Sequence, residues 1–95
     1  MSLPQKSSQP IASLKNLGPK SAQRLIAAGI PDAETLQHIG PAAAYHRVKE
    51  RFPRDTSLNL LWALQGALMD THWLHIPDDL KQHLLDELEA ITQNQ

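Results

Sequence analysis

The sequence predicts an all-α protein, a compact bundle of five to six short helices. The chain has 95 residues, of which 41% are hydrophobic and 20% charged, and this is the composition of one small globular domain. Alanine and leucine supply most of the apolar residues, whereas aromatic residues make up only 4%. This balance favours helix over strand. No segment alternates apolar and polar residues as a half-buried strand does.

Glycine and proline residues divide the chain into short segments. Residues 1–10 carry two prolines and show no periodicity, so we expect a flexible lead-in before a single helical domain at 11–95. Within that domain the pattern predicts helices over 11–16, 19–28, 33–39, 41–52, 57–70 and 77–92. Pro19, Pro41 and Pro77 suit the first position of a helix, where a missing N–H costs nothing.

Residues at the ends of these segments predict how the helices are capped. Asp32 is expected to cap the helix over 33–39, and Thr56 or Ser57 to cap the one over 57–70. Gly29 suits the left-handed conformation that closes a helix.

The last two segments predict the core. The segment 57–70 is apolar on nearly every side, which predicts a buried central helix, and Gly66 is expected to allow another part of the backbone to approach it closely. The final helix is amphipathic, with one apolar stripe formed by Leu80, Leu84, Leu85, Leu88 and Ile91.

A sequence pattern occurs twice. Leu-x-x-Leu-Gly-Pro-x-x-Ala at residues 14–22 recurs as Leu-x-x-Ile-Gly-Pro-x-x-Ala at 36–44. Each copy combines a helix end, a Gly-Pro turn and a small residue in the next helix, which predicts tandem helix–hairpin–helix-like (SAM-like) corners. The first copy resembles the helix–hairpin–helix motif of DNA-repair and replication proteins. In that motif, backbone N–H groups at a helix N-terminus hold a DNA phosphate.

The resemblance implies a site for the DNA backbone. Asn16 replaces the first glycine of the Gly-x-Gly found in that motif, and we expect Asn16→Gly to be tolerated. Gly18 is expected to adopt a conformation that penalises a side chain. Basic residues follow on the next helix and on the helix of the second copy. The candidate DNA-contacting residues are Asn16, Leu17, Gly18, Lys20, Ser21, Arg24, Arg47 and Arg51.

The formal net charge of −1 conceals an asymmetry. From Met1 to Arg54, eight basic residues stand against three acidic ones, a net charge of +5. From Asp55 to Gln95, one basic residue stands against seven acidic ones, a net charge of −6. The split indicates either a basic face for an anionic partner, with an acidic face that repels it, or two solvated surfaces that differ in sign.

Several kinds of chemistry are not indicated. The chain has no cysteine, which excludes disulfides and thiolate metal sites. His72, Trp73 and His75 could suggest a metal site, but we favour a structural role in the turn between the last two helices. No catalytic motif is present, so we expect a non-enzyme without a cofactor. Neither a membrane span nor a signal peptide is evident, so a cytoplasmic location is expected and no membrane partner.

A longer set of residues covers most of the chain: Leu14, Leu17 to Ser21, Gly29-Ile30, Ala44-Tyr45, Arg47, Ser57 to Leu61, Ala63-Leu64, Gly66-Ala67, His72-Trp73 and Pro77. On these residues, positions 14–90 resemble the C-terminal domain of TfoX/Sxy, the bacterial regulators of competence for DNA transformation. The resemblance implies a regulatory module that acts with a cyclic-AMP receptor-type activator. Full-length members carry an α+β domain before this one, so the chain is either a stand-alone version or a fragment.

Two functions remain open at this point. The module could bind DNA backbone without sequence preference. Alternatively, it could dock a transcription factor or self-associate without touching DNA. A regulatory protein partner is expected in either case, and the sequence leaves the oligomeric state open.

Overall fold

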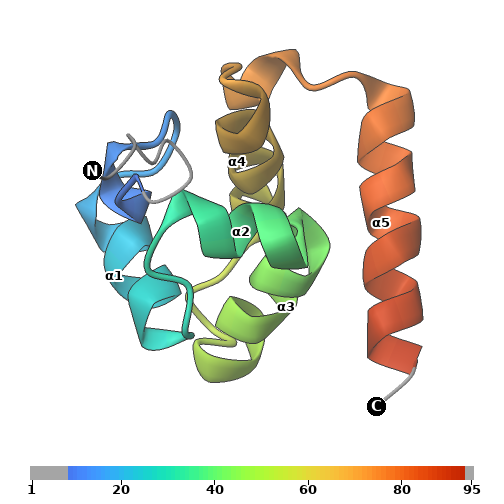
Figure 1. Cartoon of the computed structure of the whole chain (residues 1–95). Helices are drawn as coiled ribbons and strands as arrows, with labels where there is room; N and C mark the ends of the chain where they lie inside the picture. Colours follow the sequence, from blue (N-terminus) through green and yellow to red (C-terminus); the bar gives the residue numbers. More distant parts are fainter. Residues whose placement is uncertain (1–8, 94–95) are drawn as a thin grey trace.

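The structure is a computed structural model that describes residues 9–93. Its elements are the short 3-10 helices η2 (Ile11–Ser13) and η3 (Trp73–His75) and the α-helices α1 (Pro19–Ala27), α2 (Ala33–Ile39), α3 (Pro41–Arg51), α4 (Leu58–Met69) and α5 (Asp78–Gln93). Every regular element in this range is helical (Figure 1), which confirms the all-α prediction.

The start of the described chain is attached to the turn before α2. The Ala33 N–H donates to the Gln9 carbonyl at 2.8 Å, and the Ile11 N–H donates to the Pro31 carbonyl at 3.1 Å. The lead-in expected over residues 1–10 otherwise lies outside the described residues.

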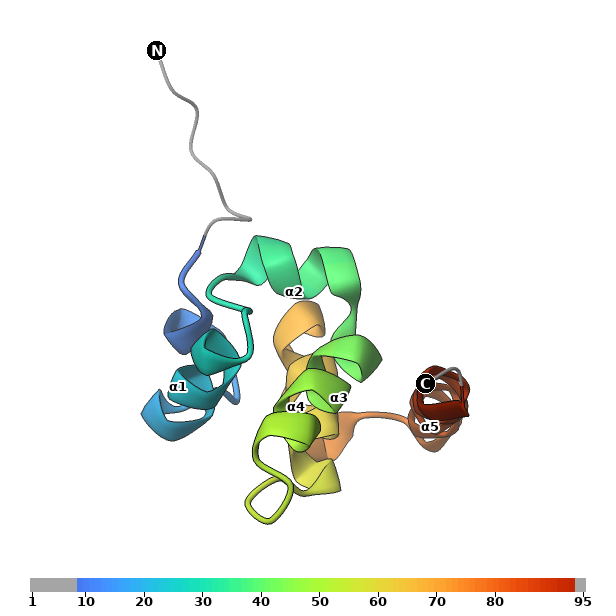
Figure 2. The same cartoon turned by 90° about the horizontal axis from the view of Figure 1, so that it is seen from below.

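The helix α3 holds the central position. It packs against α1, α2, α4 and α5, with α1 and α5 on opposite sides of the molecule (Figures 1 and 2). The helix α4 packs mainly against α3 and η3, and an extended link from η3 leads to α5, which runs beside α3. The sequence predicted the segment 57–70 as the central helix, but in the structure α3 rather than α4 has this position.

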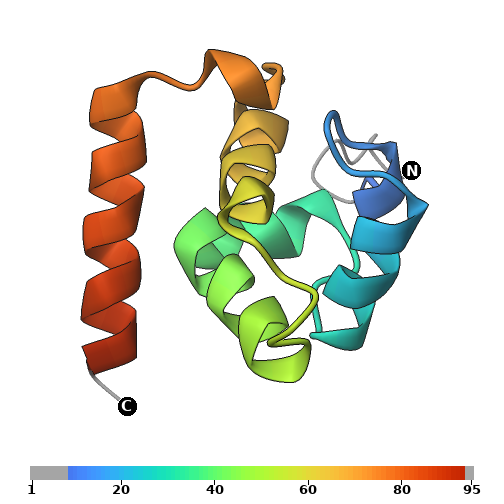
Figure 3. The same ribbon diagram turned by 180° about the vertical axis from the view of Figure 1, so that it is seen from behind.

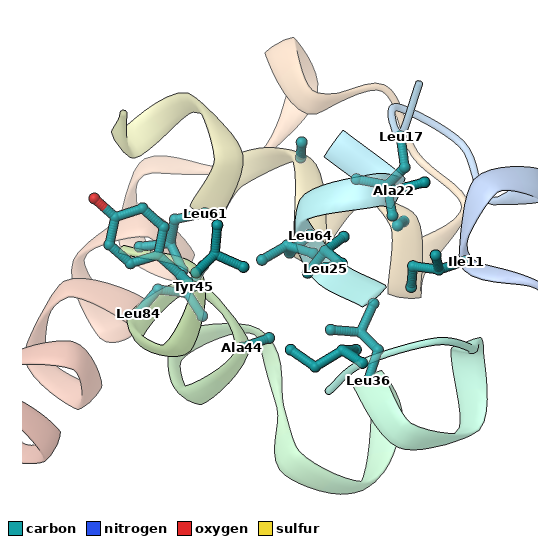
Figure 4. Packing of buried hydrophobic residues seen from close by; sticks show 14 residues of the cluster. Ile11, Leu17, Ala22, Leu25, Leu36, Ala44, Tyr45, Leu61, Leu64 and Leu84 are labelled. Carbon is teal, nitrogen blue, oxygen red and sulfur yellow. The ribbon is translucent and has the colours of Figure 1, made fainter. Parts of the chain in front are cut away.

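The core is a continuous cluster of aliphatic side chains between these helices (Figure 4). The largest fully buried members are Ile11, Leu25, Ile30, Leu36, Val48, Leu61, Leu64 and Leu84. The buried ring of Tyr45 lies beside Leu61 and Leu84, and burial raises the pKa of its hydroxyl. This group joins α5 to the rest of the domain, because Leu84 is the buried residue of that helix.

The prediction that α4 is buried on all sides is wrong for one row of residues. Leu61 and Leu64 are fully buried, but Leu58 and Met69 are each 43% exposed and Trp62 is half-buried. These three recur at spacings of four and seven residues, so they share one face of the helix. The helix therefore carries an apolar face that the fold only partly covers.

The helix caps follow local signals in part. The Asp32 carboxylate accepts from the Thr35 N–H at 2.8 Å, as expected for the cap of α2, and Gly29 has a φ of 88° at the end of α1. Ser57 occupies the cap position of α4 without a side-chain cap bond. Thr56 does not cap the helix either, because its hydroxyl donates to the Phe52 carbonyl at 2.7 Å. Pro77 lies just before α5, which begins at Asp78.

The two copies of the repeated pattern differ. In the second copy, α2 and α3 are joined through Gly40, whose φ is 87°. In the first copy, the helix expected over 11–16 is only the short η2, and the left-handed residue is Asn16, with a φ of 73°. Gly18 is extended, with φ −84° and ψ −180°, because a residue before proline is driven away from helical geometry. The expectation that Gly18 needs a glycine conformation is therefore wrong.

Candidate functional site

The turn between η2 and α1 contains the first candidate residues. Leu17 is buried and anchors the turn in the core, while its N–H donates to the Leu14 carbonyl at 3.2 Å. Gly18 and Lys20 are exposed and Ser21 is half-buried. The buried leucine thus fixes the exposed part of the turn in one position.

The Asn16 side chain points into the protein rather than into solvent. Its Nδ2 donates to the Thr71 carbonyl at 2.8 Å and to the Ala63 carbonyl at 3.5 Å. Its Oδ1 accepts from the Trp73 N–H at 3.2 Å. Asn16 therefore fastens the turn to the end of α4 and the start of η3, which is a structural role that the motif comparison did not indicate.

Gly66 makes this contact sterically feasible. A Cβ atom built on Gly66 would lie 2.5 Å from Asn16 Nδ2 and 2.5 Å from the Thr71 carbonyl oxygen. The Thr71 N–H also donates to the Gly66 carbonyl at 2.8 Å. The close backbone approach expected at Gly66 is confirmed.

The first turn of α1 has backbone hydrogen-bond donors that the helix itself does not use. Among the described residues, no acceptor takes the N–H groups of Gly18, Lys20 or Ser21. These groups lie at the positive end of the helix dipole, and the Lys20 side chain adds a full positive charge beside them. This turn has the chemical features of a weak site for an anion.

Two basic side chains donate hydrogen bonds within the domain, to carbonyl groups of the loop between α3 and α4. Arg24 Nη1 donates to the Asp55 carbonyl at 2.8 Å, and its guanidinium lies 5.8 Å from the centroid of the Phe52 ring. Lys49 Nζ donates to the Pro53 carbonyl at 2.9 Å and the Thr56 carbonyl at 2.8 Å. Arg24 and Lys49 therefore hold this loop in place.

Lys49 was not among the candidate residues. A lysine in the last turn of a helix often bonds nearby carbonyl oxygens, and this is the signal that could have identified it. Arg24 was a candidate, but its position one turn after Lys20 gave no indication of its contact with Asp55.

The remaining arginine candidates lie on the exposed side of α3. Arg47 and Arg51 are one turn apart and both exposed. A Cβ on Gly29 would lie 4.0 Å from Arg47 Nη1, so Arg47 lies near the C-terminal end of α1. Lys20 is in the first turn of the same helix, roughly 12 Å away along its axis. The structure thus places Lys20 and Arg47 near opposite ends of α1.

An open cleft lies between the N-terminal parts of α1 and α4 and the loop that joins α3 to α4. Figure 3 shows this loop passing between α1 and α4. The volume of the cleft is about 310 Å³. The lining is largely polar and consists of Asn16, Ser21, Arg24, Asp55, Thr56, Ser57, Asn59, Leu60, Ala63 and Trp73. The carboxylate of Asp55 lies 3.9 Å from the Arg24 guanidinium, so the cleft carries a paired charge rather than a free positive one.

The residues from His72 to His75 form the connection between α4 and α5. His72 Nδ1 accepts from the Leu74 N–H at 3.2 Å, and the His72 and Trp73 rings stack with centroids 6.0 Å apart. Trp73 is half-buried against the core. Within residues 9–93, no three or more metal-ligating side chains gather closely enough to hold a metal ion.

The acidic residues of the second half lie mainly on α5. They are Asp78, Asp79, Asp86, Glu87 and Glu89, all exposed. In the part of the chain that the structure describes, no helix has the length and apolar character to cross a bilayer.

These features define a small all-α domain in which a Gly-Pro turn is fastened to the end of a long apolar helix. The family model of the TfoX C-terminal domain matches residues 7–88, and the chain belongs to this family.

The chain is similar in sequence to one curated protein and in fold to one solved structure. The chain is 31% identical over 61 residues to the DNA transformation protein TfoX1 of Aliivibrio fischeri, a match that covers 64% of this chain and 29% of that protein. The matched region is thus less than a third of that relative. The fold is also similar to the crystal structure of an uncharacterized protein from Listeria monocytogenes, with a TM-score of 0.76 and 26% identity over 87% of this chain and 93% of the other.

Proposed function

We propose that this domain is a non-enzymatic regulatory module that contacts the phosphate backbone of DNA through the first turn of α1. The observation that carries the proposal is that no described residue accepts from the N–H groups of Gly18, Lys20 and Ser21, in a turn that also carries the Lys20 ammonium. Donors of this kind bind phosphate oxygens without reading bases. The family and the relative named for DNA transformation support a role in competence, which would place the module in the cytoplasm beside DNA.

The contacts within the domain reduce the set of candidate residues that could touch DNA. Asn16 and Arg24 donate to carbonyl oxygens within the domain, and Leu17 is buried. The direct contacts in this proposal are therefore the N–H groups of the turn and Lys20. Arg47 and Arg51 form a second contact farther along the backbone.

The charge distribution indicates which side of the domain would face DNA. The acidic residues of α5 lie on the opposite side of α3 from α1 (Figure 2), so they face away from DNA bound at α1. A contact with few phosphates gives weak binding with a shallow salt dependence, because the slope scales with the number of phosphates contacted.

Fluorescence anisotropy with a duplex of about 20 base pairs, two helical turns, tests this proposal at low and high salt. Affinity is expected to fall as salt rises, and Lys20→Ala is expected to weaken binding equally for unrelated sequences. The slope of the logarithm of the binding constant against that of the salt concentration should become shallower by about one unit.

Gln23→Ala is the matched control, because Gln23 is exposed on the same helix and carries no charge. This variant should bind the duplex as the native chain does. If the native chain shows no salt-sensitive binding to any duplex, or if Lys20→Ala and Gln23→Ala bind equally well, the first turn of α1 is not a DNA contact.

A further inference from the structure

The face that α4 turns to solvent is unusual for a small domain. The helix carries no charged residue between Leu58 and Met69, and its only polar side chains are those of Asn59 and Gln65. Its outward row consists of Leu58, Trp62, Gln65 and Met69, which recur at helical spacing. Leu58 and Met69 are among the large hydrophobic residues that remain exposed in the described chain.

The helix α5 extends this face on one side. Lys81 Nζ lies 5.3 Å from the centroid of the Trp62 ring, which shows the side of α5 that is turned toward α4. Asp78, Leu85 and Glu89 lie on that same side, three, four and eight residues from Lys81. Leu85 is half-buried, whereas Asp78 and Glu89 are exposed.

The face therefore has an apolar centre and an acidic border. Its centre is formed by Leu58, Trp62 and Met69 with Leu85 of α5. Acidic residues border it on two sides, along α5 and at the end of α4, where Asp70 follows Met69. Lys81 is the only lysine or arginine in the second half of the chain, and its ammonium group lies against the Trp62 ring.

We propose that this face, formed by α4 and the adjoining side of α5, binds a basic amphipathic helix of a partner protein. An apolar row on such a helix fits the apolar centre, with anchors spaced three, four and seven residues apart. Lysine or arginine residues beside that row meet the acidic border, which selects against acidic partners. The charge of the border favours this occupant over a second copy of the chain, because two copies of this face would bring their acidic residues together.

The test uses the full chain and synthetic helical peptides of about 18 residues, long enough to form a helix. One peptide places leucines on one face and lysines on the other. A second has the same composition without an apolar face, and a third replaces the lysines with glutamates. In a Trp73→Phe background, the fluorescence of Trp62 reports on the face directly. Only the first peptide is expected to bind and to shift the Trp62 emission to shorter wavelength.

Two matched pairs of variants locate the binding. Glu89→Lys should weaken binding of the basic peptide by about tenfold, whereas Glu87→Lys makes the same charge change on the other side of α5 and should have little effect. Met69→Ser should weaken binding by a similar factor. Ile26→Ser removes an apolar side chain that is also exposed, on α1, and should not weaken binding.

Several results would overturn the proposal. Equal binding of the three peptides, or equal effects within each matched pair, would show that the face does not recognise a basic amphipathic helix. A native dimer in sedimentation that Met69→Ser dissociates would show that a second copy covers the face instead. These results are independent of duplex binding at α1, because no residue of this face lies in that turn.

Discussion

Asn16 Nδ2 donates a hydrogen bond of 2.8 Å to the carbonyl oxygen of Thr71, a residue 55 positions further along the chain. The same side chain accepts from the Trp73 N–H, so one amide group satisfies a donor and an acceptor of the backbone after α4. Asn16 reaches them from a left-handed conformation, with a φ of 73°. Backbone geometry and side-chain bonding at this one residue together connect the first turn of the domain to the start of η3.

Replacing Asn16 separates these two contributions. Asn16→Gly keeps the left-handed backbone at no cost but removes the side-chain bonds, so the free energy of unfolding should fall by about 2 kcal/mol. Asn16→Ala removes the same bonds and also places a Cβ in left-handed geometry, which should cost about 1 kcal/mol more. Urea denaturation of both variants measures the two values.

The order of the two Asn16 variants is the informative result. If Asn16→Gly is as stable as the native chain, the bonds to Thr71 and Trp73 contribute nothing, and the tolerance suggested by the helix–hairpin–helix comparison holds. Equal destabilisation of both variants would show that the left-handed conformation is not maintained in solution.

Gly66 and Gly18 form a second comparison. Gly66→Ala places a methyl group against the Asn16 amide and the Thr71 carbonyl, and the backbone there cannot yield easily, so we expect a loss of about 3 kcal/mol. At Gly18 a Cβ meets nothing within 4 Å, and the backbone is extended. Gly18→Ala should therefore change stability by less than about 0.5 kcal/mol. Thermal melts that rank these two variants in the opposite order would contradict the geometry of the turn.

The features that sequence predicted correctly depend on local signals. The helix over 33–39 was predicted with the bounds that the structure shows, because Asp32 supplies a cap at one end and the Gly-Pro pair a stop at the other. Gly29, which adopts a left-handed conformation just after α1, was also predicted from a local signal. Signals of this kind act within a few residues, so no knowledge of the remaining fold is needed to interpret them.

The features that sequence did not predict depend on contacts with backbone atoms elsewhere. Asn16, Arg24 and Lys49 all donate to backbone carbonyl oxygens. Every residue has such a carbonyl, whatever its side chain, so no residue type marks the acceptor in the sequence. A basic residue committed to such a bond looks the same in sequence as one free for DNA. For this reason the predicted DNA contacts included Arg24, and the structural role of Lys49 was not predicted.

The position of α4 was misjudged for a related reason. Its composition predicts burial on every side, but the other described helices cover only part of it. The structure leaves Leu58 and Met69 exposed. A helix that is apolar all round can be buried by its own domain or by a partner, and composition does not distinguish the two.

The cap of α2 predicts a dependence of stability on pH. Bonds from the Thr35 hydroxyl at 2.7 Å and the Thr35 N–H at 2.8 Å hold the pKa of Asp32 below its usual range. A group whose pKa is lower in the folded state stabilises the fold above its unfolded pKa of about 3.9, and this contribution is lost as pH falls through the folded value. Asp32→Asn keeps an oxygen that can accept from Thr35 but does not titrate, so it is the matched variant. Urea midpoints of the native chain and Asp32→Asn should therefore differ more at pH 7 than in acid well below the folded pKa. The other carboxylates contribute equally to both proteins, so their effects cancel in this difference. Midpoints that fall in parallel over the whole range would show that the Asp32 charge does not contribute to the cap.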